Sequence, residues 1–583
     1  MNVNTEQYFS EVPHLHSPRS VFDRSFTHKT TMDVNKLYPI FIDEGLPGDS
    51  MKLDFQVFGR LINPLVVPVM DELYFETLWF KSYMLILWDN ARRFFGERDN
   101  PTDDNDFVIP TINSGSGFAV GSIFDHFGLP VNVANLDVNS LPLRMYNMVY
   151  NYWLRDQNLI NSVTFVKTDS DDVSYYSLLK SAKMHDLFTS AMPTTQINGL
   201  PFGTGPVSLP IGGTAPVFGN GKALGLTFGS TSNYDMALGY SVFSTTQSYP
   251  QLGVNFTTTD PRAVGTNTTH LDAPSAVNSN SQSIGVVTDG SRSGLVADLS
   301  QVSGINVNDL RFMIDLQRYR ERLMLGGHRY NEIVTQFFGI ETYNEPYIPE
   351  FLGMTREMID INTVIQTSST DNTSPQGNLT AYGVINHHKS ALSTSFRFHG
   401  YLLGLARIRH NPVYQQGLNK LWSRSTQLDF YNPMFNGLGE QPIKNKEIVC
   451  QGGSVLDANG DPVDDNAFGF NEAWYEYRYY PSLITGQLRS GIIDSLDVYH
   501  LAQYFGTYTT TVTSTGTVPI GVPTLPVLNQ SFIEENIPLQ RATAVTTGEE
   551  ENTPSFVMDF RFNYICARVM PVRNIPAGLY SGI

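Results

Sequence analysis

The stretch "MKLDFQVFGRL", residues 51–61, decides the fold class because its apolar and polar residues alternate. One face would carry Met51, Leu53, Phe55, Val57 and Leu61, and the other Lys52, Asp54, Gln56 and Arg60. A period of two residues is typical of a β-strand with one buried and one solvated face. The stretch therefore predicts a half-buried strand.

The same signal returns along the whole chain. "FVMDFRFNYICARVMP", residues 556–571, alternates in the same way nearly 500 residues later. "ELYFETLWFKSYML" (72–85) is rich in aromatic β-formers and predicts a more buried strand. "SFRFHGYLLGLARIRHN" (395–411) and "EAWYEYRYYPSLITG" (472–486) are further strand candidates. Strands this scattered predict one mainly β sandwich with long loop insertions and few helices.

Composition limits the functions that the chain can have. It has 583 residues, of which 41% are hydrophobic and only 16% charged, which suits a folded chain with a sizeable core. Its formal net charge of -18 argues against a surface that coats nucleic acid, so a DNA partner would need a separate basic protein. The polar N-terminus and the lack of a long apolar run predict a soluble protein made in a cytoplasm. Cys450 and Cys566 are expected to be free, buried thiols rather than a disulfide.

Two helices are predicted beside the strands, over residues 141–158 and 307–325. The second belongs to "LQRYRERLMLGGHRYNEIVTQFFG" (316–339), where a Gly-Gly pair separates it from a short helix. The arginines Arg318, Arg322 and Arg329 could form a DNA-binding face. Acidic residues flank them, however, which favours a helical hairpin with salt bridges within the subunit or to a neighbour.

A long insertion is expected at residues 194–304. Its central hundred residues hold three basic and five acidic side chains, and Ser, Thr, Asn and Gly dominate. Dispersed aromatic residues favour short strands that pack against copies of themselves over disorder: Phe218, Phe228, Tyr234, Tyr240, Phe243 and Tyr249. Smaller insertions are expected at residues 452–466 and 507–524.

The sequence predicts no catalytic, cofactor-binding or metal-binding residues and therefore no enzyme. Phosphate-loop, dinucleotide, nucleophile-elbow and zinc-protease motifs are missing. The best nucleic-acid candidate is the N-terminal segment, where basic residues alternate with Phe22 and Phe26 in a manner suited to single-stranded DNA. The candidate contacts are Arg19, Arg24, His28 and Lys29. The alternative, which we favour, is an arm that clamps a neighbouring subunit.

Nine blocks, which follow one another in the family's order over nearly the whole chain, resemble the major capsid protein of microviruses (Microviridae), in the gokushovirus branch (Gokushovirinae). These blocks are "LPGDS" (46–50), "PVMDELYFETLWF" (68–80), "WDNARRFFGERDNP" (88–101), "RMYNMVYNYWLRDQNL" (144–159), "HDLFTSAMP" (185–193), "GGHRYNEIVTQFFG" (326–339), "YQQGLNKLWSR" (414–424), "LGEQPIKNKEI" (438–448) and "FGFNEAWYEYRYYPSLITGQLR" (468–489).

The resemblance implies a single eight-stranded antiparallel jelly roll and a T=1 icosahedral shell of 60 copies around circular single-stranded DNA. An N-terminal arm (1–50) would precede a jelly-roll core (51–193 and 305–583), and the insertion (194–304) would form a surface protrusion at the threefold axes. The protrusion is expected to meet a host cell-surface receptor. A glycan is one candidate for that receptor.

Other expected partners are a small basic DNA-binding protein, an internal scaffolding protein and a pilot protein. The chain would be part of a bacteriophage virion assembled in the bacterial host cytoplasm. The alternative from a different class is a carbohydrate-binding or carbohydrate-active β-sandwich protein, because jelly rolls also occur in lectins.

Overall fold

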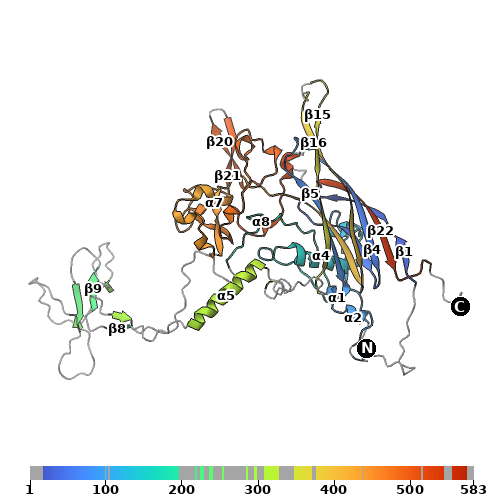
Figure 1. Ribbon diagram of the computed structural model, residues 1–583, viewed down its shortest axis with the longest axis horizontal. Coiled ribbons are helices and arrows are strands. Elements are labelled where there is room, and N and C mark those ends of the chain that lie inside the picture. Colours follow the sequence, from blue (N-terminus) through green and yellow to red (C-terminus); the bar gives the residue numbers. More distant parts are fainter. Residues whose placement is uncertain are drawn as a thin grey trace, which may run out of the picture. The chain divides into compact units, whose positions relative to one another are not determined.

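The computed structural model describes residues 18–195 (without 99, 101 and 103–105), short strands between 217 and 297, and residues 307–326, 336, 347–370, 376–437, 439–513, 516–543 and 554–573. The chain divides into two units. The first holds Met1–Phe202 and Arg320–Ile583, and the second holds Gly203–Tyr319. Figure 1 shows the first unit as a strand-rich body with helices and loops on one side.

A six-stranded antiparallel sheet forms one layer of the first unit, in the order β1-β22-β4-β16-β15, with β2 also paired to β22. Its strands are β1 (Ser20–Asp23), β2 (Phe26–Met32), β4 (Ser50–Leu61), β15 (Asp360–Ile365), β16 (Leu379–Ser395) and β22 (Phe556–Arg568). The N-terminal and C-terminal strands are therefore neighbours, and β4 lies between β22 and β16. Part of the segment predicted as an arm thus pairs within this sheet.

A four-stranded antiparallel sheet forms the second layer, in the order β14-β5-β17-β3. Its strands are β3 (Tyr38–Gly45), β5 (Leu73–Tyr83), β14 (Glu350–Met358) and β17 (Gly400–His410). The chain passes from one sheet to the other between β2 and β3, β3 and β4, β4 and β5, β14 and β15, and β16 and β17. The predicted strands at 51–61, 72–85, 395–411 and 556–571 are all confirmed.

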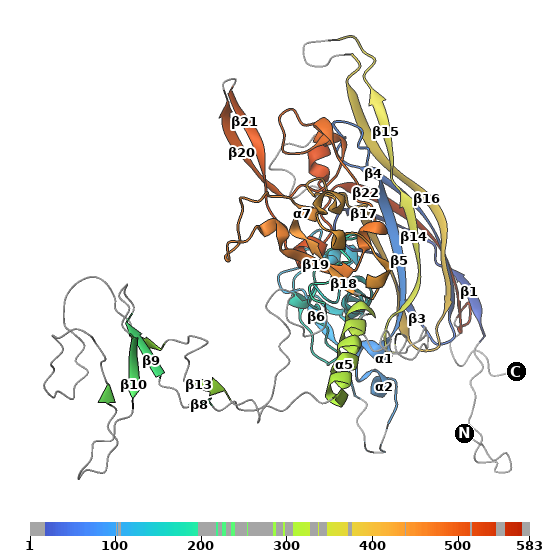
Figure 2. The same cartoon turned by 60° about the vertical axis from the view of Figure 1, so that its left-hand side comes forward.

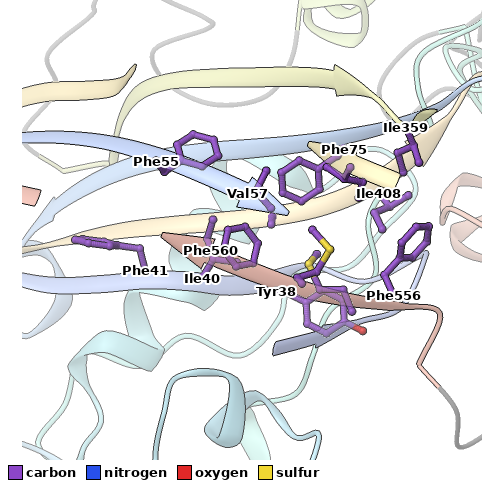
Figure 3. Close-up of a cluster of buried hydrophobic side chains, with 14 of the residues drawn as sticks. Tyr38, Ile40, Phe41, Phe55, Val57, Phe75, Ile359, Ile408, Phe556 and Phe560 are labelled. Atoms are coloured by element: carbon purple, nitrogen blue, oxygen red, sulfur yellow. The ribbon is translucent and has the colours of Figure 1, made fainter. Parts of the chain in front are cut away.

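The main core lies between the two sheets and consists of the alternating apolar residues (Figure 3). From β4 and β22, Phe55 and Phe562 point inward and are at most 1% exposed. They meet Trp79 of β5, whose ring centroid lies 6.0 Å from that of Phe55 and 6.4 Å from that of Phe562. Burying apolar surface contributes about 25 cal/mol per Å², so this core of many large side chains is the chief source of stability.

A third layer of helices and loops covers the other face of the four-stranded sheet. Its elements are α1 (Met84–Leu87), α2 (Ala91–Phe94), α3 (Ile123–His126), α4 (Leu141–Val149), the π-helical turn η2 (Tyr150–Leu154), η3 (Val173–Tyr175), β6 (Thr111–Asn113) and β7 (Asp137–Asn139). Phe80 of β5 and Leu403 of β17 point into this layer and pack in one cluster with Met145 and Val149. Both faces of β5 and β17 are therefore buried, as the sequence predicts for β5.

Residues 412–542 build a smaller lobe whose core, around Ile448 and Phe532, also includes Phe188 from earlier in the chain. Its elements are η4 (Lys420–Ser423), η5 (Gln427–Asp429), η6 (Pro433–Phe435), β18 (Glu440–Lys444), α7 (Asn445–Ile448), η7 (Val463–Asp465), β19 (Ala467–Glu472), η8 (Tyr475–Tyr477), η9 (Gly486–Leu488), η10 (Asp497–Tyr499), β20 (Gly506–Thr513), β21 (Gly516–Pro523), α8 (Gln530–Ile533) and η11 (Leu539–Ala542). Most of this lobe is loop and single 3₁₀ turns.

In the second unit, the described residues before α5 form short strands: β8 (Val217–Gly219), β9 (Leu224–Phe228), β10 (Asp235–Gly239), β11 (Gly253–Val254), β12 (Ile284–Val286) and β13 (Leu295–Ala297). Four of them form a sheet in the order β11-β10-β9-β12, and β8 pairs with β13. The helix α5 (Val307–Gly326) follows and ends at the predicted glycine pair.

Two predictions are wrong. Residues 472–486 do not form a strand beyond Glu472, because Trp474 adopts a left-handed backbone (φ 68°) and η8 follows it. Both cysteines are free, but Cys450 is exposed and only Cys566 is buried. Cys450 follows α7 at the edge of the lobe, where its thiol lies 3.3 Å from a carboxylate oxygen of Asp464.

Among the described residues, no helix has the length and hydropathy of a membrane span.

Candidate assembly and nucleic-acid interfaces

Arg24, the most strongly held of the four candidate DNA contacts, lies just after β1. Its guanidinium donates to both carboxylate oxygens of Asp43, one of them at 3.0 Å, and lies over the ring of Tyr564. Asp43 also accepts from the Tyr564 hydroxyl at 2.6 Å and from Arg568 at 3.2 Å. Arg24 therefore ties the N-terminal strands to β3 and β22, and a DNA phosphate would have to compete with Asp43.

The other three candidates also have partners within the chain. Lys29 of β2 is paired with Asp559 of β22, and both side chains are exposed. The Nδ1 atom of His28 lies 3.0 Å from the carbonyl oxygen of Ile40, and Arg19 donates to the Ser50 hydroxyl at 2.6 Å. Figure 1 shows β1 at one side of its sheet. The structure therefore places these basic residues along the β1–β2 edge of the sheet, where Arg24 and Lys29 have acidic partners.

The arginines of the predicted hairpin are only partly described. Arg318 of α5 lies 3.7 Å from Asp315, one turn earlier, and both side chains are exposed. The carbonyl oxygen of Arg322 accepts a hydrogen bond from the Gln336 side chain. Arg329 and most of the second helix lie outside the described residues. The Arg318 pair is an exposed i,i+3 pair, which stabilises a helix by a few tenths of a kcal/mol.

The aromatic residues of the insertion are placed only in part. Phe218 lies in β8 and Phe228 ends β9. Tyr234, Tyr240, Phe243 and Tyr249 lie outside the described residues.

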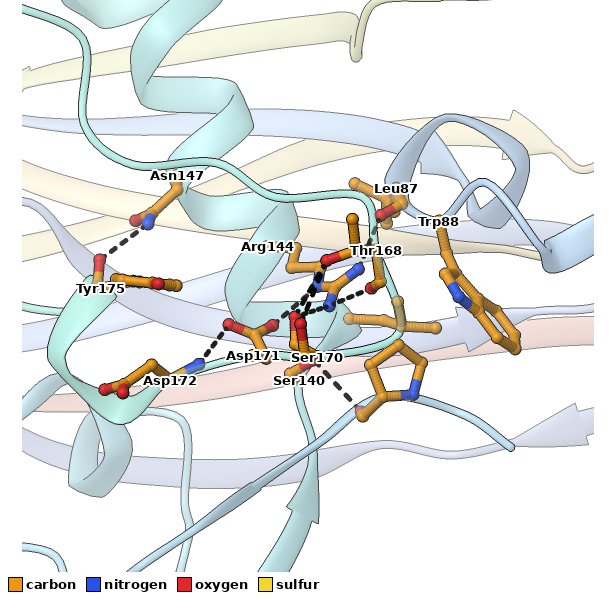
Figure 4. A network of polar contacts seen from close by, with 12 residues as sticks. Leu87, Trp88, Ser140, Arg144, Asn147, Thr168, Ser170, Asp171, Asp172 and Tyr175 are labelled. Carbon is orange, nitrogen blue, oxygen red and sulfur yellow. Dashed lines mark hydrogen bonds and ion pairs between the residues drawn. The ribbon is translucent and has the colours of Figure 1, made fainter. Parts of the chain in front are cut away.

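A fully buried ion pair anchors the helical layer (Figure 4). Arg144 of α4 donates to Asp171 at 2.7 Å, and both side chains are completely buried. The guanidinium also donates to the carbonyl oxygens of Thr168 at 2.8 Å and Leu87 at 3.3 Å. One side chain thus joins α4 to the end of α1 and to the loop of residues 168–171, a structural role that leaves no group free for chemistry.

A second buried charge cluster lies in the four-stranded sheet. Glu76 of β5 has no exposed surface and accepts from Arg356 of β14 at 2.6 Å and from Arg407 of β17 at 2.8 Å. Arg409 adds a third contact at 3.5 Å. Burial would raise the pKa of Glu76, but the arginines outweigh it and hold that pKa below its ordinary value. Glu76 therefore stays ionised and connects three strands.

Among the described residues, no three His, Cys, Asp or Glu side chains gather in a way that could hold a metal ion. Both buried clusters consist of ion pairs that join elements of the fold. The buried charges of these two clusters hold strands, helices and loops in position.

The surface that stands out is apolar and lies in the lobe. Seven large apolar side chains are exposed within residues 421–435: Leu421, Trp422, Leu428, Phe430, Tyr431, Met434 and Phe435. We call this set the 421–435 surface. Trp422 is 76% exposed and Met434 is 87% exposed. Soluble monomers rarely expose so many large apolar groups together, and aromatic residues and Met are enriched where protein partners bind.

The 421–435 surface is held in place from behind. Arg424 contacts Glu476 at 3.3 Å and lies over the ring of Tyr477, 4.6 Å from its centroid. The ring of Tyr431 packs edge-on against Trp474 at 5.6 Å, and its backbone N–H donates to the Tyr477 hydroxyl at 3.3 Å. The segment is therefore fixed to η8 before any partner arrives.

Local turns fix its shape as well. The side chain of Asn419 caps η4, and that of Asn432 caps η6. Asp429 accepts hydrogen bonds from the backbone N–H groups of Ser425 and Thr426 and from the Thr426 hydroxyl, and these bonds lower its pKa to about 2. A surface that is ordered in advance loses less conformational entropy on binding. This arrangement suits a permanent protein–protein contact.

Sequence reasoning missed the 421–435 surface. Its apolar residues follow neither a period of two nor one of 3.6, because each 3₁₀ turn redirects the chain. The available signal was an unusual mixture: large apolar residues interspersed with the turn formers Asn, Asp, Ser and Pro.

Known proteins resemble the chain over its full length. The family described as "Capsid protein (F protein)" matches residues 10–578. The capsid protein VP1 of Bdellovibrio phage phiMH2K is 39% identical, with 98% of each chain covered. VP1 of Chlamydia phage 1 is 36% identical and VP1 of Spiroplasma virus 4 is 31% identical, each with 97% of both chains covered.

These matches agree with the blocks that first suggested a microvirus capsid protein, and all three relatives are capsid proteins of gokushoviruses. Such proteins are structural and not enzymes. The chain therefore belongs to the F-protein family of phage capsid proteins, in the gokushovirus branch of the microviruses.

Proposed function

We propose that this major capsid protein assembles as 60 copies into a T=1 icosahedral shell that encloses the circular single-stranded DNA of a bacteriophage. The observation that carries the proposal is the preformed, exposed 421–435 surface on a chain of the capsid family. An isolated subunit would leave these side chains in water, whereas a shell can cover them with neighbouring copies.

In this proposal the two packed sheets act as the rigid tile of the shell. Eight strands, β3, β4, β5, β14, β15, β16, β17 and β22, would form the jelly roll, with β1 and β2 added beside β22. The repeated passage of the chain from one sheet to the other supports this assignment. Residues 194–304 would gather at the threefold axes as a protrusion that meets a host receptor.

The genome contact is proposed at the sheet edge that carries Arg19, Arg24, His28 and Lys29. Arg19 and Lys29 are exposed, so a phosphate can reach them without unfolding of the sheet. A net charge of -18 leaves most phosphates without a partner on this chain. A small basic DNA-binding protein would neutralise them, and an internal scaffolding protein and a pilot protein would complete the particle.

The test is purification of the protein from cells that express it with its viral partners, followed by electron microscopy and sedimentation. Uniform icosahedral particles whose nucleic acid is degraded by a nuclease specific for single strands are expected. Sedimentation only as a chain of 65.1 kDa, or particles that hold duplex DNA, would overturn the proposal.

A further inference from the structure

The hairpin β20–β21 has no strand neighbour among the described residues: it is a sheet of two strands. Figures 1 and 2 show it standing out from the body of the first unit. Residues 506–523 carry no charged side chain and are rich in Thr and Val. A lone two-stranded hairpin is marginally stable in water, and an uncharged edge invites another strand.

Two backbone hydrogen bonds fix which way the peptide groups of the hairpin point. The Thr524 N–H donates to the Phe505 carbonyl, so this pair is bonded across the hairpin. The Gly521 N–H instead donates outward to the Gly491 carbonyl at 3.0 Å. Because N–H direction alternates along a strand, the odd-numbered residues of β21 point outward. The residues opposite them in β20 point outward too, and these are Gly506, Tyr508, Thr510 and Val512.

The two outer edges of the hairpin are therefore unequal. On β21 the outward positions include Pro519 and Pro523, which have no N–H, and Gly521, whose N–H already binds Gly491. On β20 no proline occurs, so its outward residues keep both donor and acceptor. The β21 edge is closed to a further strand and the β20 edge is open.

We propose that β20 pairs antiparallel with β20 of a second copy across a twofold axis, which joins two hairpins into one four-stranded sheet. A twofold contact uses the same surface on both copies, and an uncharged strand can meet itself without repulsion. A ring or filament would need β20 to pair with β21 of the next copy, which the two prolines prevent. The pairing therefore stops at two copies.

This inference deepens the proposed function, on which it rests only in placing the pair at a twofold axis of the shell. The contact itself can be tested by disulfide trapping. In a Cys450→Ser background, single cysteines replace Tyr508, Thr509, Thr510, Thr511 or Val512, one at a time. Near a twofold axis a residue faces its own copy, so at least one variant should give a covalent dimer on oxidation of assembled particles. No dimer at any of the five positions would overturn the pairing.

A matched proline pair tests the edge itself. Thr510→Pro removes an outward N–H from β20 and leaves the bonds within the hairpin intact. Thr517→Pro removes an outward N–H from β21, the edge that is already closed. Thr510→Pro should lower the yield of particles at least about tenfold, as expected for one lost hydrogen bond per copy, and Thr517→Pro should leave it near wild type.

Equal effects of the two prolines, or normal particles from Thr510→Pro, would overturn the inference and leave the capsid function standing. If the wild-type chain itself forms no particles, the capsid function fails instead. The melting temperature of each unassembled variant, compared with wild type, shows whether a lost yield comes from misfolding. If the Thr510→Pro chain melts well below the Thr517→Pro chain, its lower particle yield reflects misfolding. Disulfide trapping alone then decides whether β20 pairs with β20.

Discussion

At the scale of single residues, buried charges hold the sheets and layers in register. Glu76 connects β5, β14 and β17 through Arg356, Arg407 and Arg409, and Arg144 fastens the helical layer through Asp171. Once such a pair is buried, removing one partner leaves the other without compensation, which destabilises far more than loss of a surface pair.

Replacing Glu76 by Gln should therefore lower the free energy of unfolding of the unassembled subunit by about 3–5 kcal/mol, because Arg407 and Arg409 would remain buried without the carboxylate that contacts them. Denaturant unfolding at pH 7 measures the change. Glu357→Gln, at a half-exposed side chain of β14 that pairs with His387, is the control and should shift stability by less than about 1 kcal/mol. Equal effects from both variants would contradict the role given to Glu76.

Glu440 should make stability depend on pH. Burial, with a contribution from Glu321, raises its pKa from 4.5 to about 7. A carboxyl whose pKa is raised on folding stabilises the fold below its unfolded pKa, and this stabilisation is lost as pH rises from about 4.5 to 7. Glu440→Gln should therefore be neutral at pH 4.5 and stabilising at pH 8, by about 1–2 kcal/mol after allowance for solvent screening.

Thermal unfolding of the unassembled chain at both pH values tests this dependence. The exposed Glu97→Gln provides the control and should give the same small effect at pH 4.5 and pH 8. A Glu440→Gln variant that is no more stable than wild type at pH 8 would show that folding does not raise the pKa of the Glu440 carboxyl.

At the scale of elements, strict alternation was sufficient to predict β4 and β22 and the face that each buries, because one face of their sheet is solvated. The composition of β5 predicted a more buried strand, because both faces of β5 are covered. The lobe could not be predicted in this way. Its conformation depends on individual long-range bonds, such as that of the Tyr475 hydroxyl to Glu447 at 2.5 Å, and such contacts leave no periodic pattern.

The 421–435 surface should be needed for assembly and not for folding. Changing Trp422 and Met434 together to Ser removes two highly exposed apolar groups without opening a cavity. Particle yield should fall at least about tenfold, since central aromatic contacts often contribute 2 kcal/mol or more each. The melting temperature of the unassembled chain should stay within about 2 °C of wild type.

Met70→Ser, which alters a similarly exposed methionine outside the lobe, serves as the control. If the Trp422/Met434 double variant assembles as well as wild type, the 421–435 surface is not an assembly contact. A large fall in its melting temperature would instead mean that these side chains pack within the subunit.

At the scale of the whole molecule, the chain is a two-sheet sandwich with long insertions, and the proposed assembly contacts lie in those insertions. The second unit, Gly203–Tyr319, is defined by contacts that its residues make with one another. The sequence predicted an insertion in this region from composition alone. Its strands could not be placed because the Gly- and Thr-rich segments show no regular alternation of apolar and polar residues.

Deleting Gly199–Ser300 should leave a soluble first unit and weaken threefold contacts and host attachment. The sandwich keeps its own core, so its melting temperature should change little. Sedimentation reports on assembly, and binding of particles to host cells reports on attachment. Wild-type infectivity from the deletion would contradict the attachment role.

A side-chain-level electron microscopy reconstruction of purified particles tests the central claim most directly. The account predicts an icosahedral shell of 60 copies around single-stranded DNA, in which neighbouring copies cover Trp422 and Met434. A shell in which both side chains face solvent, or a purified chain that forms no symmetric particle, would contradict it.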